Sequence, residues 1–379
     1  MSEKIPFTDC VDLAGSSVKK YDGTRLYVST GALDCDHIDF SQVEECTYEN
    51  KPSRANLAAD CGTVLFAKMQ GTKKTIVLDD KTSDYIYSTG FAAVRARPDI
   101  ISERCLYHLV TSAYFLRQKD KYCSGATQKA ITNKGLEKIM ISVPDTALQL
   151  GIADRLDLLD TASRLCQRIL ERLDDIIKSR FVEMFGDPLK PTKSRLLGEI
   201  AILERGRFSP RPRNDSRYYN GMYPFVQTGD VANCDHRLSQ YHQTLNEEGI
   251  KVSKRFEPGT ILIALVGATI GATAILEIPM YAPDSLIGIT ANDDECNNVF
   301  LEVLLRFWQA ELKRIAPEAA RANINLRILQ NVPIIDVPVP QQEIFAAFVA
   351  DIEKSKSAVA KCLQKTEYLK SALMQQYFG

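Results

Sequence analysis

The sequence predicts an α+β protein that contains two similar globular units, each followed by a long helix. Three observations support this fold class. Short motifs recur at a separation of 194 to 198 residues, two regions carry a heptad pattern, and short β-rich runs alternate with glycine-containing turns. Residues 27–31 (YVSTG) return as residues 225–229 (FVQTG), and residues 62–65 (GTVL) return as residues 259–262 (GTIL). A solenoid repeat spans only a few tens of residues, so this longer period indicates a duplicated module with two similar working surfaces.

The length of 379 residues suggests two or three domains, and a hydrophobic content of 45% gives each copy enough apolar material for its own core. The N-terminus carries no charged-then-apolar leader, and no apolar run approaches the roughly 18 residues that a membrane helix needs. We therefore expect a soluble cytoplasmic protein. The net charge of −1 argues against binding of polyanions over the whole surface, although it allows local basic patches.

The ten cysteines form no Cys-x-x-Cys pair, and the four histidines lie outside zinc-ligand spacing, so we expect no metal site. In a chain of this size the cysteines are interpreted as reduced, mostly buried thiols. Cys166 and Cys362 fall on the apolar seams of the two heptad regions at positions that we interpret as equivalent. Packing explains this pair better than chemistry does.

Each heptad region predicts a long helix with a narrow seam, in alternating steps of three and four residues. The intervening positions carry dense charge of both signs, which is typical of solvated coiled-coil faces. The first seam runs through Leu156, Leu159, Ser163, Cys166, Leu170, Leu173, Ile177, Arg180 and Met184. The second runs through Phe345, Phe348, Ile352, Ser355, Val359, Cys362, Thr366, Leu369 and Leu373.

These two helices are expected to pair as an antiparallel coiled coil with pseudo-twofold symmetry. Each spans about 35 residues, or about 50 Å, and residues 185–188 (FGDP) end the first helix. Antiparallel pairing would place the globular units at opposite ends of a rod that sets their spacing. The alternative is two ordinary amphipathic helices, each lying on its own domain.

The globular units are expected to combine a small sheet with helices. β-rich runs occupy residues 63–67, 74–79, 261–266 and 273–277, and a helical stretch follows in each copy at residues 102–116 and 298–315.

Basic and polar residues gather in loops of both copies. Residues 205–217 contain five arginines against one aspartate, and residues 68–74 read KMQGTKK. Lys19, Lys20 and Arg25 form a further patch around Tyr21. Arginine can bond to guanine and to phosphate, whereas glutamine and asparagine can bond to adenine. The alternative for each patch alone is an ordinary solvated surface, and the recurrence in both copies favours nucleic-acid binding.

Several segments together resemble the specificity subunit of type I restriction-modification systems. They are residues 178–188 (KSRFVEMFGDP), residues 125–132 (GATQKAIT) leading to 141–144 (ISVP), and residues 319–326 (AARANINL) leading to 337–342 (VPVPQQ). The resemblance covers nearly the whole chain. One departure follows Pro144, where residues 145–149 read DTALQ and the family usually has a second proline and an acidic residue before the glutamine. The start of the first helix is therefore left open.

This resemblance implies two target recognition domains, residues 1–147 and 188–340, with conserved helices at 148–187 and 341–379. Each domain would read one half of a bipartite target in double-stranded DNA, and the helices would space the halves and dock two methyltransferase subunits. Those subunits would bring S-adenosylmethionine and methylate adenine, and restriction subunits would use ATP and Mg²⁺. The chain itself would carry no catalytic residue and no cofactor. Half-sites one helical turn apart, about 34 Å, suit a rod of about 50 Å.

Enzyme functions lack the motifs that they require. Residues 331–333 (NVP) lack the second proline of an adenine methyltransferase motif, and no phosphate-binding loop with its lysine occurs. A nuclease site built from Asp284, Glu311 and Lys313 is disfavoured because Glu311 and Lys313, two residues apart on a helix, point to different faces. The remaining alternative is a coiled-coil spacer whose duplicated domains bind another protein.

These patterns identify candidate site residues. They do not determine which DNA sequence those residues recognise. For DNA contact we predict Lys68, Lys73, Lys74, Gln128, Lys129, Arg205, Arg207, Arg211, Arg213, Arg321 and Asn323. For the coiled coil and partner docking we predict Leu159, Leu170, Leu173, Ile177, Ile352, Val359 and Leu369.

Overall fold

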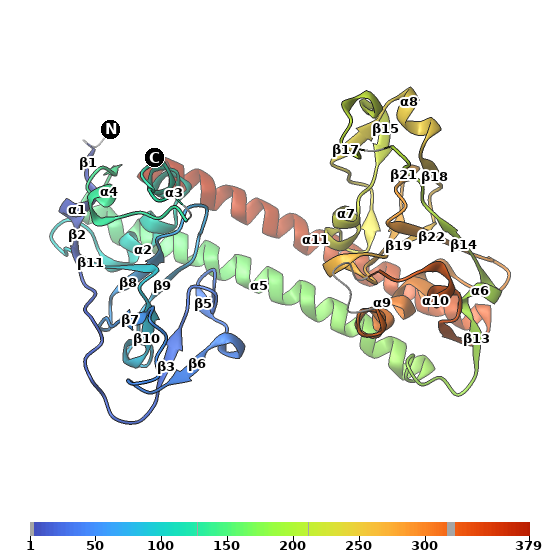
Figure 1. Cartoon of the computed structure of the whole chain (residues 1–379), viewed down its shortest axis with the longest axis horizontal. Helices are drawn as coiled ribbons and strands as arrows, with labels where there is room; N and C mark the ends of the chain where they lie inside the picture. Colours follow the sequence, from blue (N-terminus) through green and yellow to red (C-terminus); the bar gives the residue numbers. More distant parts are fainter. Residues whose placement is uncertain (1–3, 127, 211, 317–322) are drawn as a thin grey trace. The chain divides into compact units, whose positions relative to one another are not determined.

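The computed structural model describes residues 4–126, 128–210, 212–316 and 323–379. The chain divides into two compact units, of which unit 1 comprises residues 1–168 and 359–379 and unit 2 comprises residues 169–358. Two helices of 40 residues, α5 (Thr146–Phe185) and α11 (Val339–Phe378), each contribute to both units (Figure 1). Unit 1 is therefore built from two separate stretches of the chain.

Unit 1 contains two four-stranded sheets with helices packed on one of them. The first sheet has the order β2 (Val11–Leu13), β11 (Phe91–Ala96), β8 (Val64–Ala67) and β9 (Thr75–Val77), and the second has the order β6 (Glu44–Cys46), β3 (Arg25–Val28), β10 (Ile86–Ser88) and β7 (Ala55–Leu57). The other elements are β1 (Ile5–Pro6), α1 (Phe7–Cys10), β4 (Leu33–Asp34), β5 (His37–Ile38), α2 (Glu103–Thr111), α3 (Ala113–Lys121), α4 (Asn133–Leu136) and β12 (Met140–Ile141), with 3₁₀ helices at Phe40–Gln42 and Thr82–Asp84.

The core of unit 1 lies between the first sheet, α2, α3 and the ends of the long helices. α2 packs on β8, β9 and β11. The rings of Phe7 and Phe66 both pack against that of Phe115, with centroids 4.9 and 5.4 Å away. Met374 and Phe378, near the end of α11, belong to the same buried cluster. The last turns of the chain therefore complete the core of the first unit.

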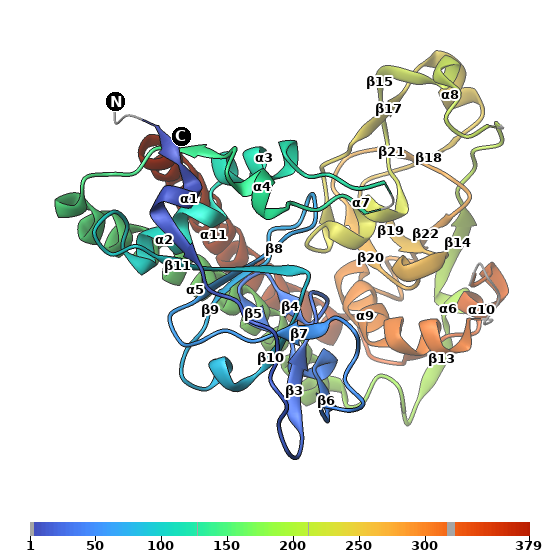
Figure 2. The ribbon, with the colours of Figure 1, turned by 60° about the vertical axis from the view of Figure 1, so that its left-hand side comes forward.

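Unit 2 repeats this plan with one additional strand. Its five-stranded sheet has the order β14 (Ala201–Arg205), β22 (Leu286–Ala291), β19 (Ile261–Ala264), β20 (Thr273–Leu276) and β16 (Arg237–Leu238). Its four-stranded sheet has the order β17 (Gln243–Leu245), β15 (Tyr219–Phe225), β21 (Met280–Ala282) and β18 (Lys254–Phe256). The other elements are β13 (Ser194–Leu196), α6 (Leu197–Ile200), α7 (Thr228–Asn233), α8 (Glu247–Lys251), α9 (Asn298–Ile315), α10 (Leu326–Gln330) and β23 (Pro333–Ile335), with 3₁₀ helices at Ser216–Tyr218 and Gly267–Thr269. α9 packs on β20 and β22, as Figures 1 and 2 show.

The strand pairing confirms the duplication that the repeated motifs predict. In unit 1, β3 pairs in parallel with β10, and each has an antiparallel outer neighbour. In unit 2, β15 pairs in parallel with β21, again with antiparallel outer neighbours. The α+β class and the predicted β-rich runs are therefore confirmed, whereas the parallel strand β16 on β20 is specific to unit 2.

The long helices pack antiparallel within each unit, as predicted. In unit 1, Asp160 of α5 forms an ion pair with Lys370 of α11, and Arg155 bonds to the Tyr377 hydroxyl near the end of the chain. In unit 2, Asp174 forms an ion pair with Lys356 at 2.7 Å, and further along α5 the ring of Phe181 lies 5.3 Å from that of Phe345. In both units, residues later in α5 therefore contact residues earlier in α11, which is the pattern of antiparallel helices.

The predicted seam of the second helix is partly wrong. Ser355 and Cys362 are exposed and Leu369 is 49% exposed, whereas Lys356, which follows Ser355, is buried. The predicted seam residues Phe345 and Thr366 are buried as expected. On the first helix, Phe181 is fully buried beside the predicted Arg180. The buried face of the second helix includes the charged Lys356, so a search for apolar positions in steps of three and four places alternate seam positions one residue too early.

The helices therefore repeat at a different offset from the one that the sequence suggested. Equivalent buried positions are Gln149 and Gln342, Ile152 and Phe345, and Leu156 and Val349, all 193 residues apart. Cys166 and Cys362 lie 196 residues apart, and they are not equivalent. The ten cysteines are free thiols, as predicted. Five of them are buried, whereas the sequence predicted that most would be.

The helix boundaries agree with most of the predicted signals. α5 begins at Thr146 in spite of the departure after Pro144, and it ends at Phe185 before Gly186, whose φ of +85° favours glycine. The helical stretch predicted at residues 102–116 is divided at Ser112, whose backbone is extended and whose hydroxyl caps α3 by accepting from Phe115 N at 3.1 Å. Within the described residues, no helix combines the length and the apolar character needed to cross a membrane.

Candidate nucleic-acid interface

The structure brings three of the predicted DNA-contacting residues of unit 1 together. The loop between β8 and β9 pairs with the segment that precedes α4, because Met69 bridges to Ala130 and Ile131 N donates to Lys68 O at 2.9 Å. Gln128 and Lys129 are exposed beside this bridge, and Lys68 is half-buried. Burial lowers the pKa of the Lys68 ammonium. These side chains form a polar and basic surface on two loops that are joined by backbone hydrogen bonds.

Lys119 was missed by the sequence analysis, although it fixes this surface. Its side chain is buried, and Nζ donates to the carbonyl oxygens of Met69 at 2.9 Å, Thr72 at 2.8 Å and Ala67 at 3.3 Å. Burial lowers its pKa, and the neighbouring carboxylate of Asp120 acts in the opposite direction. The available signal was its place one helical turn after the buried Phe115.

The two remaining lysines of this loop have different surroundings. Lys74 Nζ donates to Thr30 O at 2.9 Å and Gly31 O at 3.3 Å, so its ammonium ties β9 to the repeated YVSTG segment. Lys73 is exposed and lines a cavity of about 350 Å³ with residues of α3 and α11, among them Tyr114 and Met374. Lys74 is therefore mainly a structural residue, and any contact of Lys73 with DNA stays a prediction.

The described arginines of the basic loop in unit 2 are anchored by backbone and carboxylate oxygens. Arg205 Nε donates to Asp284 O at 2.7 Å, and Arg207 donates to Lys251 O at 3.2 Å and Ser253 O at 3.1 Å. Arg213 forms an ion pair with the Asp284 carboxylate and remains 47% exposed. Because a guanidinium has five N–H groups, each of these arginines keeps donors for a phosphate or a base.

Gly206 explains why this loop lies close to β21 and β22. A Cβ atom at this position would lie 2.2 Å from Pro283 O, so no other residue fits. The glycine N–H donates to Leu286 O at 2.9 Å, and the next residue, Arg207, donates from its own backbone to Ala282 O at 2.9 Å. The predicted residues Arg211 and Arg321 lie outside the described residues.

Asn323 belongs to the counterpart of the unit 1 loop pair. It is exposed and bridges to Val266, and Ile324 N donates to Leu265 O at 3.0 Å. The bridge between Met69 and Ala130 has the same place in unit 1. The structure therefore places Asn323 at the turn between β19 and β20, whereas the described arginines gather beside β21 and β22.

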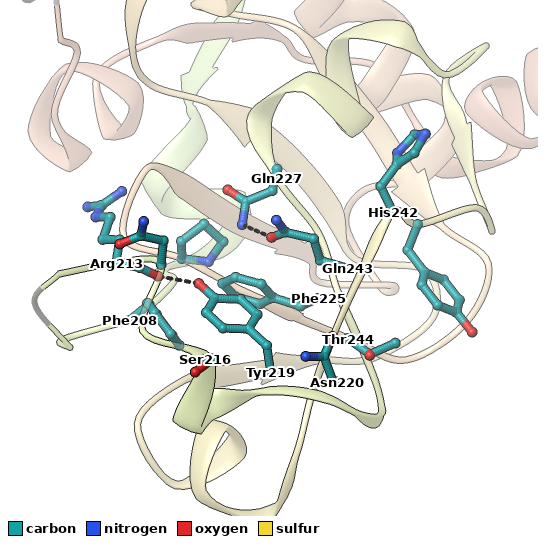
Figure 3. A pocket seen from close by; sticks show the side chains of 13 residues that line it. Phe208, Arg213, Ser216, Tyr219, Asn220, Phe225, Gln227, His242, Gln243 and Thr244 are labelled. Atoms are coloured by element: carbon teal, nitrogen blue, oxygen red, sulfur yellow. Dashed lines mark hydrogen bonds between the residues drawn. The ribbon is translucent and has the colours of Figure 1, made fainter.

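A cavity of about 720 Å³ opens beside the arginine loop, and the sequence analysis did not foresee it (Figure 3). Aromatic rings line part of it, with the centroid of Phe208 5.1 Å from that of Phe225 and 5.7 Å from that of Tyr219. The Tyr219 hydroxyl donates to Arg213 O. Besides Tyr241 and Pro283, the other lining residues are polar: Arg213, Asn214, Ser216, Asn220, Gln227, His242, Gln243 and Thr244.

Two glutamines are held in a fixed arrangement at this cavity. Gln227 Nε2 donates to Gln243 Oε1 at 3.0 Å. Gln227 lies between β15 and α7, where its backbone N–H donates to Asp230 Oδ2 at 2.7 Å, and Gln243 is the strand partner of Phe225. Asp230 Oδ1 also pairs with the exposed His242 ring at 2.5 Å. The repeated FVQTG motif was the available signal for Gln227.

A buried charge cluster joins the globular part of unit 2 to the helix pair. Lys356 Nζ contacts Asp174 at 2.7 Å and Asp235 at 2.5 Å, and its side chain is 2% exposed. Next to it, Glu302 pairs with Arg306 at 2.5 Å and with His236 Nδ1 at 3.1 Å. Burial alone would raise the pKa of Glu302, but the positive charge of Arg306 and the His236 hydrogen bond outweigh it and lower the pKa to about 2.

The residues predicted for partner docking differ in exposure. Ile177 is buried, Leu369 is exposed, and the others are half-buried: Leu159, Leu170, Leu173, Ile352 and Val359. A separate apolar row on α5 is exposed and consists of Leu158, Leu165, Ile169 and Ile176. These positions are seven, four and seven residues apart, so they share one helix face.

The carboxylates weighed for a nuclease site have separate partners in the structure. Among the described residues, no group of three or more histidine, cysteine, aspartate or glutamate side chains could hold a metal ion. Asp284 pairs with Arg213, while Glu311 pairs with Arg314 on α9. The nuclease set considered from the sequence is therefore divided between different ion pairs.

Comparisons with known proteins agree with this architecture. A family model described as the type I restriction modification DNA specificity domain matches residues 35–175 and 190–367. The type I restriction-modification system S subunit from M. genitalium aligns with a TM-score of 0.58 at 15% identity, covering 100% of this chain and 96% of that chain. A chain from a structure of complex assembly and conformational transition of the type I R-M system aligns with a TM-score of 0.55 at 20% identity, covering 99% and 97%. At these identities the structural matches establish a shared fold alone.

Proposed function

Because the chain belongs to the family of type I restriction-modification DNA specificity subunits, we propose that it reads a bipartite DNA target, with one half-site bound by each unit. The observation that carries this proposal is the duplication of the whole domain. Two copies of one sheet topology carry different side chains in equivalent loops. A shared scaffold with different loop chemistry suits two different half-sites.

Affinity for the duplex would come mainly from the basic loops. Lys68 and Lys129 in unit 1, and Arg205, Arg207 and Arg213 in unit 2, keep donors that can reach phosphate. Their anchored backbones would fix the position of the protein on the duplex, whereas contacts to base edges would determine the sequence. The near-neutral net charge limits electrostatic attraction to these surfaces.

The partners of this chain would be methyltransferase subunits and, where present, restriction subunits. The structure of a related chain comes from a complex assembly of the type I R-M system. The exposed row Leu158, Leu165, Ile169 and Ile176 is an apolar surface of the kind that partner subunits cover. S-adenosylmethionine, ATP and Mg²⁺ would bind to those partners, and this chain would contribute sequence recognition without catalysis.

A gel-shift assay of the chain with its methyltransferase subunits on genomic DNA fragments tests this proposal. We expect a shift that competitor DNA lacking the target does not abolish, and whose affinity falls steeply with salt concentration because phosphate contacts release counterions. Failure to shift any fragment, together with stable capture of a protein partner, would instead support the coiled-coil adaptor alternative.

The contribution of the arginine loop can be measured in the same assay. We expect Arg207→Ala to weaken binding to the cognate site because a guanidinium beside the duplex is removed, and to reduce the salt dependence. Arg255→Ala is the matched control, because Arg255 is 51% exposed on β18 and pairs with Glu257. Equal affinities of the two variants at several salt concentrations would remove Arg207 from the interface.

A further inference from the structure

We infer that the amide pair of Gln227 and Gln243 reads the major-groove edge of an adenine in the half-site bound by unit 2. This inference rests on the proposed function and adds a specific base contact to it. It starts from the two side chains that line the cavity of about 720 Å³ and hydrogen-bond to each other (Figure 3).

The pair presents one acceptor and one donor that no other described residue of the protein uses. Gln227 donates from Nε2, which leaves its Oε1 as an acceptor, and Gln243 accepts at Oε1, which leaves its Nε2 as a donor. Among the residues that the structure describes, neither of these two atoms has a hydrogen-bond partner. Whichever way the two amides are turned, a pair joined by one N–H···O bond leaves one free carbonyl and one free NH₂ group.

Adenine is the base whose major-groove edge complements this pattern. It combines the N6 amino donor with the N7 acceptor, whereas guanine presents two acceptors. Gln227 Oε1 would accept from N6, and Gln243 Nε2 would donate to N7. A guanine in the same position would bring its O6 against the Gln227 carbonyl, so two acceptors would face each other and binding would weaken.

The surroundings fix the backbones of both glutamines, and the mutual hydrogen bond orients the two amides before DNA binds. Gln227 is half-buried, and its backbone N–H is fixed by the buried Asp230 carboxylate at 2.7 Å. Gln243 begins β17 and pairs with the buried Phe225. Side chains that are already ordered lose less conformational entropy when they bind. At the same cavity the Arg213 guanidinium is 47% exposed, so a cation is available to a phosphate next to the bound base.

The equivalent position in unit 1 carries different chemistry. The repeat aligns Gln227 with Ser29, whose hydroxyl accepts from Ala32 N at 3.2 Å. A serine hydroxyl lacks the separate donor and acceptor of an amide. The two units therefore share the backbone motif but differ in the side chain at its reading position, which would give the two half-sites different sequences at this point.

The test uses the complete complex of this chain with its methyltransferase subunits and S-adenosylmethionine. Unmodified genomic DNA is treated, and the methylated motif is determined by long-read sequencing for the wild type, Gln227→Leu, Gln243→Leu and Gln243→Glu. Gln240→Leu is the control, because Gln240 is an exposed glutamine just before β17 that does not line the cavity. We expect each leucine variant to lose preference for adenine at one position of one half-site by about tenfold or more.

The Gln243→Glu variant separates base reading from damage to the fold. A glutamate still accepts the hydrogen bond from Gln227, but it replaces the free donor with an acceptor. The preferred base at that position should change from adenine toward cytosine, whose N4 amino group donates. A misfolded protein cannot gain a new preference.

The outcomes are distinguishable. An unchanged motif with the Gln243→Glu complex, or altered preferences in both half-sites, would overturn the inference while leaving the proposed function intact. A wild-type complex that methylates no motif with two halves would contradict the proposed function itself, and the inference with it.

Discussion

Three backbone carbonyls around the Lys119 ammonium illustrate how single buried side chains shape the candidate interface. The β8–β9 loop has no packed core of its own, so its conformation depends on such polar anchors. Unit 2 uses the buried Asp230 carboxylate for a similar purpose, since it holds both the Gln227 backbone and the His242 ring. At this scale, the exposed reading surface is determined by polar groups beneath it.

Replacing Lys119 with methionine should loosen the loop that carries Lys68. The variant leaves three carbonyls without their shared donor, and an unsatisfied buried polar group costs about 1–3 kcal/mol. Faster hydrogen exchange at residues 68–74 and a lower urea midpoint are the expected results. Lys121→Met, at an exposed position of the same helix, is the control. Identical exchange in the two variants would show that Lys119 does not fix the loop.

The buried Glu302 should make unit 2 sensitive to acid. Its folded pKa of about 2 lies below the usual glutamic acid value of 4.5, so its contribution to stability is complete above about pH 4.5 and is lost as the pH falls toward 2. Glu302→Gln leaves Arg306 buried without its carboxylate and should lower stability at pH 7 by about 3–5 kcal/mol.

Urea unfolding at pH 7, 4 and 3 measures this effect as the difference between wild type and variant. The difference should remain constant down to about pH 4.5 and then shrink. Glu311→Gln on the same helix, where the carboxylate forms an exposed pair with Arg314, should change stability little. A difference that is equal at pH 7 and pH 3 would contradict the role assigned to the ionised Glu302.

At the scale of elements, the first turn of each long helix carries a buried glutamine that hydrogen-bonds to the preceding domain. Gln149 Oε1 accepts from Ser102 N at 2.7 Å, and Gln342 Oε1 accepts from Asn297 N at 2.8 Å. Ser102 and Asn297 are the N-cap residues of α2 and α9. In each unit, the same side-chain amide therefore fixes the start of one helix against the cap of another.

Either glutamine should be essential for the local stability of its own unit. Gln149→Leu or Gln342→Leu removes bonds to buried backbone groups, and we expect a loss of about 1–3 kcal/mol. Hydrogen exchange should increase around α2 in the first variant and around α9 in the second. Gln341→Leu, at the exposed neighbouring position, should leave both regions unchanged. Matching increases in both units from one substitution would contradict this local assignment.

The sequence predicts most elements because their signals are local. β-rich runs and a capped helix such as α9 follow from residues that lie next to each other. The register of the second helix was partly mispredicted because the buried Lys356 and the half-buried Lys370 pair with Asp174 and Asp160, which lie about 180 to 210 residues away in the sequence. The cavity with Gln227 and Gln243 was missed for the same reason, since strand pairing brings its walls together.

At the scale of the whole molecule, both long helices pass from one unit to the other. α5 does so between Arg168 and Ile169, and α11 does so between Ala358 and Val359. The two units have separate hydrophobic cores, so a change at the crossings need not disturb the core of either unit. This separation leads to a prediction about target spacing.

Inserting seven residues at both crossings should change the spacer of the DNA target and leave both half-sites intact. One heptad preserves the helical seam and adds about 10 Å, which corresponds to roughly three base pairs. Long-read sequencing of DNA methylated by the variant complex provides the measurement. Insertion of alanine and glutamate residues after Gly379 is the control. A motif with its original spacer would show that these helices do not set the distance.

The discontinuity of unit 1 also affects how the protein is made. The ribosome finishes residues 1–168 early, but the segment that completes their core, from Val359 onward, emerges only after all of unit 2. At about 5–20 residues per second, this delay is roughly 10 to 40 seconds. During this delay the face of α5 that packs against the end of α11 stays uncovered in the nascent first unit. A neighbouring nascent chain or a chaperone can bind this face until α11 has been synthesised.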